Sequence, residues 1–491
     1  MEYTREQQAI IGTARATRQG GLKVVAYAGS GKTTTLKGIA GARPDGGLYL
    51  AFNRSTKEAA TQSFPRDVRC MTPHGVAYAA MDMRSHKDRL VPRFRPSEVS
   101  RRMGVSGGDL GPATVVTNMA LQIVEAFCRS LDGEITERQI DGAGLRVPSP
   151  VDRQRLLHLA RKIWDDASGP SGPLTHDVYL KQFHLSGKPI PGRVDYILFD
   201  EAQDADGLML DIVSRQGAPI FFVGDRHQQL YAFRGAVNAM DRISLPALSL
   251  CQSFRFGSAV AHVANWLLGL KHSPAEHMII GSPFRQTVVE PSLPSCGHTV
   301  LCRTNAGVLD SAARTTEAIH IIGGYEETAA LARAAYGLWT GERQTFGVLA
   351  AFPTWADLAV YQAEVHDQEL TFLVRMVETY GTQLPAVLDA INRRHTNNPA
   401  AARIVLSTVH KAKGAEYPVV VLGEDFPVLD DAFRRDMPDK FDEEINILYV
   451  AATRPLDALM VNSTLLEMSR TEFLLSRPGA CRSASASDGR P

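Results

Sequence analysis

Short apolar runs that each end in polar, loop-like residues recur along this chain of 491 residues, and they are the feature that most restricts its fold. Such runs are typical of buried strands in a parallel sheet, although hydrophobic periodicity alone does not separate them from buried helix. In such sheets, function gathers at the carboxyl ends of the strands. The runs are LKVVAYAGSG, GLYLAFN, DYILFDEAQD, APIFFVGD, HTVLCRTN, ARIVLSTVH and YPVVVLGED. The pattern predicts an α/β protein.

The composition is that of an ordinary globular protein, with 44% hydrophobic and 22% charged residues, so a mainly disordered or collagen-like chain is excluded. At roughly 150 residues per domain, the length predicts about three domains. Lys plus Arg equals Asp plus Glu, at 53 each, so no global basic field indicates a nucleic-acid partner. Any such surface must be local.

The first residues, MEYTREQQAI, lack the apolar core of a secretory signal, and no run approaches the roughly 18 apolar residues of a membrane helix. We therefore expect a cytoplasmic protein with no membrane partner. The cysteines include no C-x-x-C pair, so we expect reduced, mostly buried thiols and no disulfide framework, zinc site or iron–sulfur cluster. They are Cys70, Cys128, Cys251, Cys296, Cys302 and Cys481.

Two insertions are expected within the α/β framework. Between Lys32 and Asp200 lie far more residues than the roughly 30 of one βαβ unit, which predicts an inserted subdomain near 83–191. Its segment 84–102 carries seven Lys or Arg against two acidic residues, with Phe94 among them. This segment is either a surface for a nucleic-acid backbone or a solvated basic face without a ligand.

The second predicted insertion spans 326–399, where ETAALARAAYGLW and LAVYQAEVHDQELTFLVRMVETY have the pattern of amphipathic helices. The small, polar tail at 478–491 is predicted to be disordered.

The segment AYAGSGKTTTL, residues 26–36, follows an apolar run and precedes a predicted helix, which is the context of a phosphate-binding loop. Lys32 would hold the β and γ phosphates of ATP, and Thr33 would bind Mg²⁺. Ala26 stands where the strict pattern has its first glycine, and the alternative is a chance glycine-rich turn. The positions expected to surround the nucleotide are Ala28, Gly29, Ser30, Gly31, Lys32, Thr33 and Thr34.

Two adjacent carboxylates, Asp200 and Glu201, end the run in LFDEAQD. In phosphate-loop enzymes the first such Asp holds Mg²⁺, while the next Glu can orient or deprotonate the attacking water. The alternative is ordinary surface charge.

A third carboxyl-end loop reads FVGDRHQQLYAFRGA, in which Gln228 could reach a γ-phosphate or water. Tyr231, Phe233 and Arg234 follow it. Aromatic rings beside a guanidinium suit stacking on bases, although such rings also commonly belong to a core.

With these motifs in order, the chain resembles the superfamily 1A helicases of the Rep, UvrD and PcrA group, and within it the helicase core of the F-box DNA helicase family. GDRHQQLYAFRGAVNA carries the more specific resemblance, together with THDVYLKQFHLS at 175–186. The ordered motifs extend from TREQQ near the start to LYVAATR, which ends at Arg454.

The resemblance implies roles for residues outside the phosphate loop. Gln7 would bind the adenine edge, Phe254 in QSFRF would stack on the adenine ring, and Glu416 in STVHKAKGAEYP would hydrogen-bond the ribose. Arg255 and Arg454 become γ-phosphate arginines supplied by a second RecA-like domain.

The resemblance also implies a track for single-stranded DNA. The positions that match it are Phe52, Asn53, His74, Tyr231, Phe233 and Arg234, and His410 matches a position that couples the DNA and ATP sites. Thr34 and Pro455 depart from the pattern, because the Rep and UvrD group has an arginine and a small residue there.

The resemblance further implies two RecA-like domains, each with a mainly helical insertion. The predicted ranges are 1–82 with 192–250 for the first RecA-like domain, 83–191 for its insertion, 251–325 with 400–477 for the second, and 326–399 for a reduced second insertion. The expected function is an ATP- and Mg²⁺-dependent helicase or translocase on single-stranded DNA and its junctions with duplex. Polarity, 3′ to 5′, and a role in repair, recombination or defence follow from the resemblance alone.

A different class of function stays open: an ATP-operated DNA-sensing switch that serves a larger assembly with a protein partner. The short second insertion and the balanced charge favour dependence on a partner. A fused nuclease is not expected, because 37 residues follow Arg454.

Overall fold

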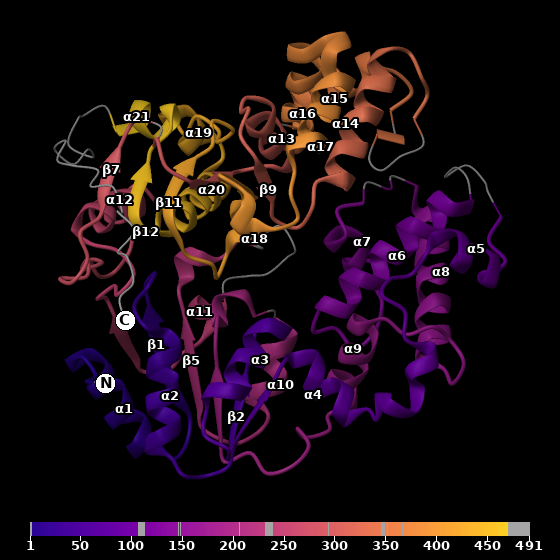
Figure 1. Ribbon diagram of the computed structural model, residues 1–491. Coiled ribbons are helices and arrows are strands. Elements are labelled where there is room, and N and C mark those ends of the chain that lie inside the picture. Colours follow the sequence, from indigo (N-terminus) through magenta and orange to yellow (C-terminus); the bar gives the residue numbers. More distant parts are fainter. Residues whose placement is uncertain are drawn as a thin grey trace. The chain divides into compact units, whose positions relative to one another are not determined.

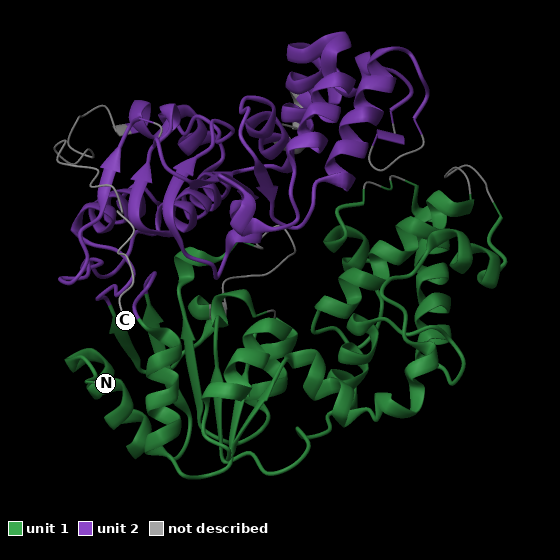
Figure 2. Cartoon of the chain, viewed as in Figure 1, with its two compact units in different colours: residues 1–26, 31–250 green, residues 27–30, 251–491 purple. Residues whose placement is uncertain are grey.

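The computed structural model describes residues 2–106, 113–145, 147, 149–205, 207–230, 239–292, 294–344, 349–350, 352–365 and 368–469 (Figure 1). The chain forms two compact units (Figure 2). Unit 1 comprises residues 1–26 and 31–250, and unit 2 comprises residues 27–30 and 251–491. Each unit is built on its own parallel sheet, as the apolar runs predict, so the α/β class is confirmed.

The sheet of unit 1 has six parallel strands in the order β3-β2-β4-β5-β1-β6. Four of the predicted runs form its β1, β2, β4 and β5. Its strands are β1 (Gly21–Ala26), β2 (Gly47–Leu50), β3 (Val68–Met71), β4 (Tyr196–Phe199), β5 (Ile220–Gly224) and β6 (Ala247–Leu250).

Each face of this sheet has a separate hydrophobic core, because side chains alternate between the faces along a strand. On β2, Leu48 and Leu50 belong to one core, while Tyr49 belongs to the other, which includes residues of α1 and α2. The helices outside the insertion are α1 (Arg5–Ala16), α2 (Lys32–Ala42), α3 (Arg54–Ser63), α4 (Pro73–Ala80), α10 (Gly207–Ser214) and α11 (Ala239–Arg242), with 3₁₀ turns η2 (Ala202–Asp204) and η3 (Arg226–Gln228).

The segment between α4 and β4 is helical and shares its core with the sheet face that carries Leu48 and Leu50. Figure 1 shows α6 to α9 grouped beside α4. The elements are η1 (Met83–Arg89), α5 (Pro96–Met103), α6 (Ala113–Arg129), α7 (Arg138–Gly142), α8 (Pro150–Ser168) and α9 (His176–Ser186).

A fully buried lysine ties α9 to the end of α6. Lys181 Nζ donates to the carbonyl oxygens of Ser130 and Asp132, both at 2.7 Å, and lies 4.5 Å from the centre of the Phe127 ring. Carbonyl dipoles and a ring face offset the desolvation of the ammonium group, so this charge fixes the middle of α9 relative to the end of α6.

The basic segment 84–102 has internal partners. Arg89 donates to the carbonyl oxygens of Ala167, Gly169 and Gly172, and Arg102 pairs with Asp166. Phe94 packs against the core of the insertion. The fold thus uses part of this segment internally, and a nucleic-acid role for it stays a prediction.

The sheet of unit 2 also has six parallel strands, in the order β7-β12-β11-β8-β10-β9. The other three predicted runs form β8, β10 and β11. The strands are β7 (Val288–Glu290), β8 (His298–Cys302), β9 (Ile319–Ile321), β10 (Ile404–Thr408), β11 (Tyr417–Leu422) and β12 (Pro455–Met460).

Between β9 and β10, unit 2 carries a second helical segment, and its core is continuous with β8, β9, β10 and α13. Its elements are α14 (Glu326–Trp339), α15 (Trp355–Val365), α16 (Gln368–Tyr380), η6 (Gly381–Gln383), α17 (Leu384–Arg394) and η7 (Pro399–Ala401). The other helices are α12 (Ser258–Gly269), α13 (Asn305–Ala313), α18 (Val409–Ala412), α19 (Asp431–Asp436), α20 (Pro438–Ala452) and α21 (Ser463–Ser469).

In the described ranges, no helix is both long and apolar enough to cross a membrane. Cys70, Cys128, Cys251, Cys296 and Cys302 are free thiols, and Cys296 alone among these five is exposed. Cys481 and the predicted tail at 478–491 lie outside the described residues.

Candidate functional site

The glycine-rich loop lies between β1 and α2, as predicted for a phosphate-binding loop. Gly29 and Gly31 have φ angles of +71° and +80°, which favour glycine. Gly29 also lies against the QSFR segment, because a Cβ atom there would be 2.6 Å from Ser253 Oγ and 2.7 Å from Arg255 Cβ. Both the backbone conformation and the close approach therefore require glycine at position 29.

Residues 27–30 of this loop group with unit 2, and Figure 2 colours them accordingly. The Phe254 N–H donates to the Gly29 carbonyl at 2.8 Å, and the Ala28 N–H donates to the Tyr449 hydroxyl at 3.0 Å. Ser30 Oγ donates to the Tyr27 carbonyl at 2.7 Å. The loop is thus held by residues of the QSFRF and LYVAATR motifs.

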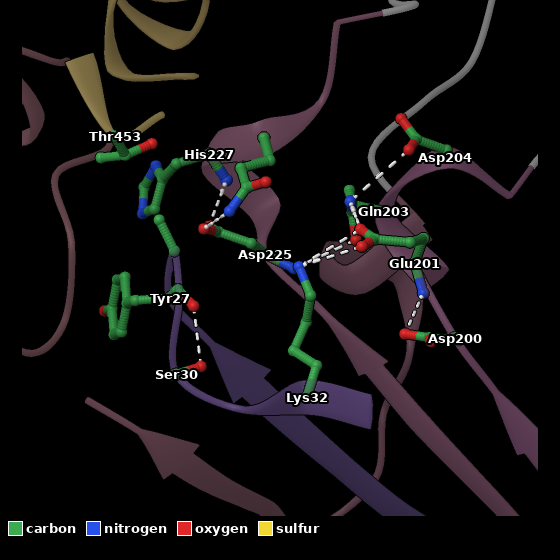
Figure 3. A network of polar contacts seen from close by, with 12 residues as sticks. Tyr27, Ser30, Lys32, Asp200, Glu201, Gln203, Asp204, Asp225, His227 and Thr453 are labelled. Carbon is green, nitrogen blue, oxygen red and sulfur yellow. Dashed lines mark hydrogen bonds and ion pairs between the residues drawn. The ribbon is translucent and has the colours of Figure 1, made fainter. Parts of the chain in front are cut away.

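Lys32, the first residue of α2, forms an ion pair with Glu201 (Figure 3). Lys32 Nζ lies 3.2 Å from Glu201 Oε1 and 3.3 Å from Oε2. Burial alone would lower the pKa of Lys32, but the carboxylates of Glu201, Asp225 and Asp200 outweigh it and the pKa is raised. The ammonium is therefore surrounded by acidic groups and stays charged.

Asp200 follows β4 and is buried. Its carboxylate accepts from the Tyr49 hydroxyl at 2.7 Å and from the Glu201 N–H at 2.9 Å. Burial, followed by repulsion from Glu201, raises the pKa of Asp200 to about 6. Glu201 has a φ of +51°, a conformation that is uncommon outside glycine and that gathers at functional sites.

The donor set fits a hard cation. Asp200 is a buried carboxylate with excess negative charge around it, and Thr33 is exposed in the first turn of α2. Carboxylate and hydroxyl oxygens beside a phosphate are the ligands that Mg²⁺ prefers.

Three polar residues beyond the predicted set complete this network. Gln203 Nε2 donates to Glu201 Oε2 at 2.5 Å, and Gln203 Oε1 accepts from the Asp225 N–H at 3.0 Å. Asp225 in turn accepts from Gln228 Nε2 at 2.8 Å. Tyr49, Gln203 and Asp225 are functional candidates that sequence reasoning missed, although Asp225 ends the predicted run APIFFVGD, where the carboxyl-end rule could have found it.

Gln7, the predicted adenine-binding residue, is buried against α2. It completes a capping box with Thr4, and its Nε2 donates to Thr35 Oγ1 at 3.3 Å. A carboxamide has two donor hydrogens and two lone pairs on oxygen, so these contacts leave capacity for a base. Thr34 lies on α2 and is half-buried.

Within unit 2, the two predicted arginines and Glu416 lie close together. Arg255 Nε donates to Glu416 Oε1 at 2.7 Å, and Arg255 Nη1 donates to the Thr453 carbonyl at 3.0 Å. Arg454 is buried; its Nε donates to the Val450 carbonyl at 2.9 Å. Phe254 is about two-fifths exposed, as a ring available for stacking would be.

The DNA-track candidates of unit 1 follow neighbouring strands. Phe52, which is 42% exposed, and Asn53, the N-cap of α3, come after β2, and His74 lies in the first turn of α4 after β3. Because β2 pairs with β3 in parallel, these residues share one edge of the sheet. In unit 2, His410 lies on α18.

Tyr231, Phe233 and Arg234 lie outside the described residues, so the geometry of these three DNA-track candidates is not part of the site described above.

A glycine-rich loop between a strand and a helix, a lysine from that helix and adjacent carboxylates at another strand end define the phosphate-loop nucleotide-binding class. The family model of the UvrD/REP helicase N-terminal domain matches residues 117–241, and that of the UvrD-like helicase C-terminal domain matches residues 362–465. One family model of UvrD-like helicases thus matches in each unit, and the two matches support a UvrD-like superfamily 1 helicase.

Two curated relatives are similar over most of the chain. F-box DNA helicase protein 1 of Schizosaccharomyces pombe is 32% identical over 500 residues, which cover 93% of this chain and 57% of the relative. F-box DNA helicase 1 of Gallus gallus is 29% identical over 508 residues, which cover 95% and 49%. The chain therefore spans about half the length of these relatives.

Proposed function

We propose that this chain is an ATP-dependent helicase or translocase that moves along single-stranded DNA, from 3′ to 5′. The observation that carries the proposal is the arrangement of Lys32, Asp200 and Glu201 next to a glycine-rich loop. The two UvrD-like family matches and the similarity to two F-box DNA helicases support DNA as the substrate. The polarity is proposed from the resemblance of the motifs to the Rep, UvrD and PcrA group.

In the proposed cycle, Lys32 exchanges Glu201 for the β and γ phosphates of ATP. Thr33 and Asp200 hold Mg²⁺, which when bound neutralises charge on the phosphates. Glu201, released from Lys32, orients and deprotonates the attacking water, and Gln228 binds that water or the γ-phosphate. The ion pair between Lys32 and Glu201 supports this proposal, because it places both groups side by side at the end of the glycine-rich loop.

Arg255 and Arg454 of unit 2 act on the γ-phosphate in this proposal, while Gln7, Phe254 and Glu416 hold the nucleoside. Arginines in related sites contribute about 10³ to 10⁵ in rate, or roughly 4 to 7 kcal/mol. Rapid hydrolysis then needs both units, so the arginines make turnover depend on closure of the units around ATP.

Single-stranded DNA passes over Phe52, Asn53 and His74 in this proposal, and then over Tyr231, Phe233 and Arg234, with His410 linking DNA to ATP. Stacking on an aromatic ring contributes about 1 to 3 kcal/mol per base and is tolerant of sequence. Each cycle of closure and opening can therefore advance the strand without reading it.

The test combines an ATPase assay with single-turnover unwinding of 3′-tailed and 5′-tailed duplexes. We expect ATP hydrolysis to be stimulated by single-stranded DNA, and the 3′-tailed duplex to be unwound faster. Stimulation without translocation would instead identify the DNA-sensing switch. Hydrolysis that ignores DNA would contradict both.

A further inference from the structure

The segment THDVYLKQFHLS, singled out in the sequence, forms the N-terminal cap and the whole of α9. Its Lys181 is explained by the clamp on α6, and Val178 and Tyr179 belong to the core, but neither explains the polar residues His176 and Asp177 that open the helix. The first turn of α9 packs beside the first turn of α4, and each helix is capped by a threonine: Thr72 accepts from the Gly75 N–H and Thr175 from the Val178 N–H. The second residues of the two helices, His74 and Asp177, therefore meet.

His74, His176, Asp177 and Tyr179 form what we call the histidine–aspartate cluster. His74 Nε2 lies 3.4 Å from Asp177 Oδ1, and both side chains are slightly under half exposed. The hydrogen bond to His74 lowers the pKa of Asp177, although burial opposes the shift. The carboxylate is therefore ionised and holds one nitrogen of the imidazole.

Two further rings fix the plane of His74. Its ring centre lies 6.1 Å from that of His176 and 6.4 Å from that of Tyr179, both edge to face. The Tyr179 hydroxyl lies 2.8 Å from His176 Nδ1, which joins the two rings. Burial raises the pKa of Tyr179 to about 12, so this hydroxyl stays protonated.

If DNA passes over His74, Asp177 places a negative charge next to the DNA phosphates. A surface carboxylate beside a phosphodiester repels it, so Asp177 alone would weaken DNA binding. The contact with Asp177, however, occupies Nε2, which leaves Nδ1 as the ring nitrogen that a ligand would use.

We propose that Asp177 is a positioning residue that orients His74: its carboxylate accepts from Nε2–H, and in the DNA complex, with both ring nitrogens protonated, His74 donates through Nδ1–H to a phosphodiester oxygen of single-stranded DNA. This inference rests on the proposed function and assigns the opening of THDVYLKQFHLS to the DNA track. A hydrogen bond to a charged group loses strength steeply when its direction is lost, so the gain from orientation exceeds the repulsion by the carboxylate.

The sign of one substitution tests this idea. In a fluorescence-anisotropy titration with an oligothymidylate, Asp177→Ala should weaken binding about tenfold, the effect of one charge-assisted hydrogen bond. Repulsion between the Asp177 carboxylate and the phosphates, taken alone, predicts the opposite result, which is tighter binding by Asp177→Ala. Asp177→Asn keeps an acceptor for Nε2–H and removes the charge, so it should bind at least as tightly as the wild type, within about twofold.

A double-mutant cycle with His74→Ala separates positioning from a structural role. If Asp177 acts through His74, the Asp177→Ala/His74→Ala protein should bind no more weakly than His74→Ala alone. Asp166→Ala is the matched control, because Asp166 pairs with Arg102 in the same unit and does not contact His74. Circular dichroism checks folding, and Asp177→Ser, too short to reach His74, replaces the Ala variant if that variant folds poorly.

Unchanged or tighter binding by Asp177→Ala, or additive losses in the cycle, would overturn the inference. Loss of binding by Asp177→Asn equal to that of Asp177→Ala would overturn it as well. If the wild type itself does not bind the oligothymidylate, the failure belongs to the proposed function instead.

Discussion

Each sheet contains an inner strand that leads through a loop into a helix, β1–α2 and β8–α13, but the two loops differ in what they can bind. Between β1 and α2 the loop is rich in glycine and leads to Lys32, a charged side chain at the start of α2. In unit 2 the loop is short, and Thr304 caps α13. The same strand–loop–helix order thus carries different chemistry at the carboxyl end of its strand.

In unit 2 the chain supplies its own anion. Asp425, which follows β11, accepts from the N–H groups of Arg303 and Thr304 at 2.8 and 2.7 Å, and from Thr304 Oγ1 at 2.9 Å. A Cβ atom at Gly307 would lie 2.0 Å from Asp425 Oδ2, so the carboxylate fills the space over the first turn of α13. An internal carboxylate therefore sits where a phosphate would bind.

The ion pairs of the two units also differ, in their geometry and in their exposure to solvent. Arg303 binds Glu444 through Nε and Nη2, both at 2.9 Å, and Glu444 is almost fully buried. Lys32 and Glu201 are more exposed as a pair, and Lys32 has one nitrogen to share. The comparison teaches that a bidentate, buried pair serves stability, whereas a single-point pair can exchange partners during turnover.

The largest effect is expected at the glycine-rich loop between β1 and α2. Lys32→Ala should reduce ATP turnover by about 10³-fold, because a charge on the transferred phosphates is lost, while DNA binding persists. A steady-state ATPase assay measures the loss. Lys37→Ala, on the same helix, should keep wild-type turnover. Substantial turnover by Lys32→Ala would remove the site assignment and with it the contrast between the loops.

The second effect concerns the buried pair. Arg303→Met should destabilise unit 2 by about 3 kcal/mol or more, because Glu444 is left as a buried, unpaired charge. Arg303→Met/Glu444→Met should recover much of that loss, since an apolar pair replaces the ions. Urea denaturation with hydrogen exchange at β8 gives the measurement. In contrast, Glu201→Gln should change stability by less than about 0.5 kcal/mol while lowering turnover. Equal destabilisation by both would break the comparison.

A smaller effect is expected on DNA. Phe52→Ala should weaken binding of an oligothymidylate by about 1 to 3 kcal/mol, because one base loses its stacking surface. Phe284, 88% exposed in unit 2, provides the control, and Phe284→Ala should leave affinity unchanged. If the two variants lose equal affinity in an anisotropy titration, the DNA binds nonspecifically to exposed rings and does not follow a defined track.

The smallest effect compares two caps. Thr72 and Thr304 each accept from a backbone N–H three residues later, but Thr304 also donates to Asp425. Thr72→Ala should cost about 1 kcal/mol of stability and Thr304→Ala about 2. Denaturation midpoints of the two variants measure this difference, and the reverse order would show that Asp425 does not depend on Thr304.

The sequence predicts the strands that lie in continuous apolar runs, including the four-residue strands β2 and β4. It does not indicate β3, β6, β7, β9 or β12, since β7 and β9 have three residues each and the others carry polar or partly exposed residues, as in VRCM of β3. The helices α14 and α16 follow from their amphipathic patterns.

The site is predictable where one motif contains it and is not where distant segments meet. Lys32 and Gly29 follow from the loop pattern, whereas the bond between Ala28 and Tyr449 joins residues 421 positions apart. Acidic residues at a strand end do not by themselves indicate a site, since DYILFDE and YPVVVLGED both end in them. Asp200 lies near the charges of Glu201 and Lys32, whereas Asp425 accepts hydrogen bonds from the backbone N–H groups of Arg303 and Thr304. Only contacts distinguish a reactive carboxylate from a structural one.

The buried ammonium of Lys181 gives the protein an internal reporter. An acylating reagent cannot reach an amine with no exposed surface, so Lys181 should become labelled only when α9 separates from the end of α6. The time course of its modification by mass spectrometry would therefore measure how often that part of unit 1 opens, without any engineered probe.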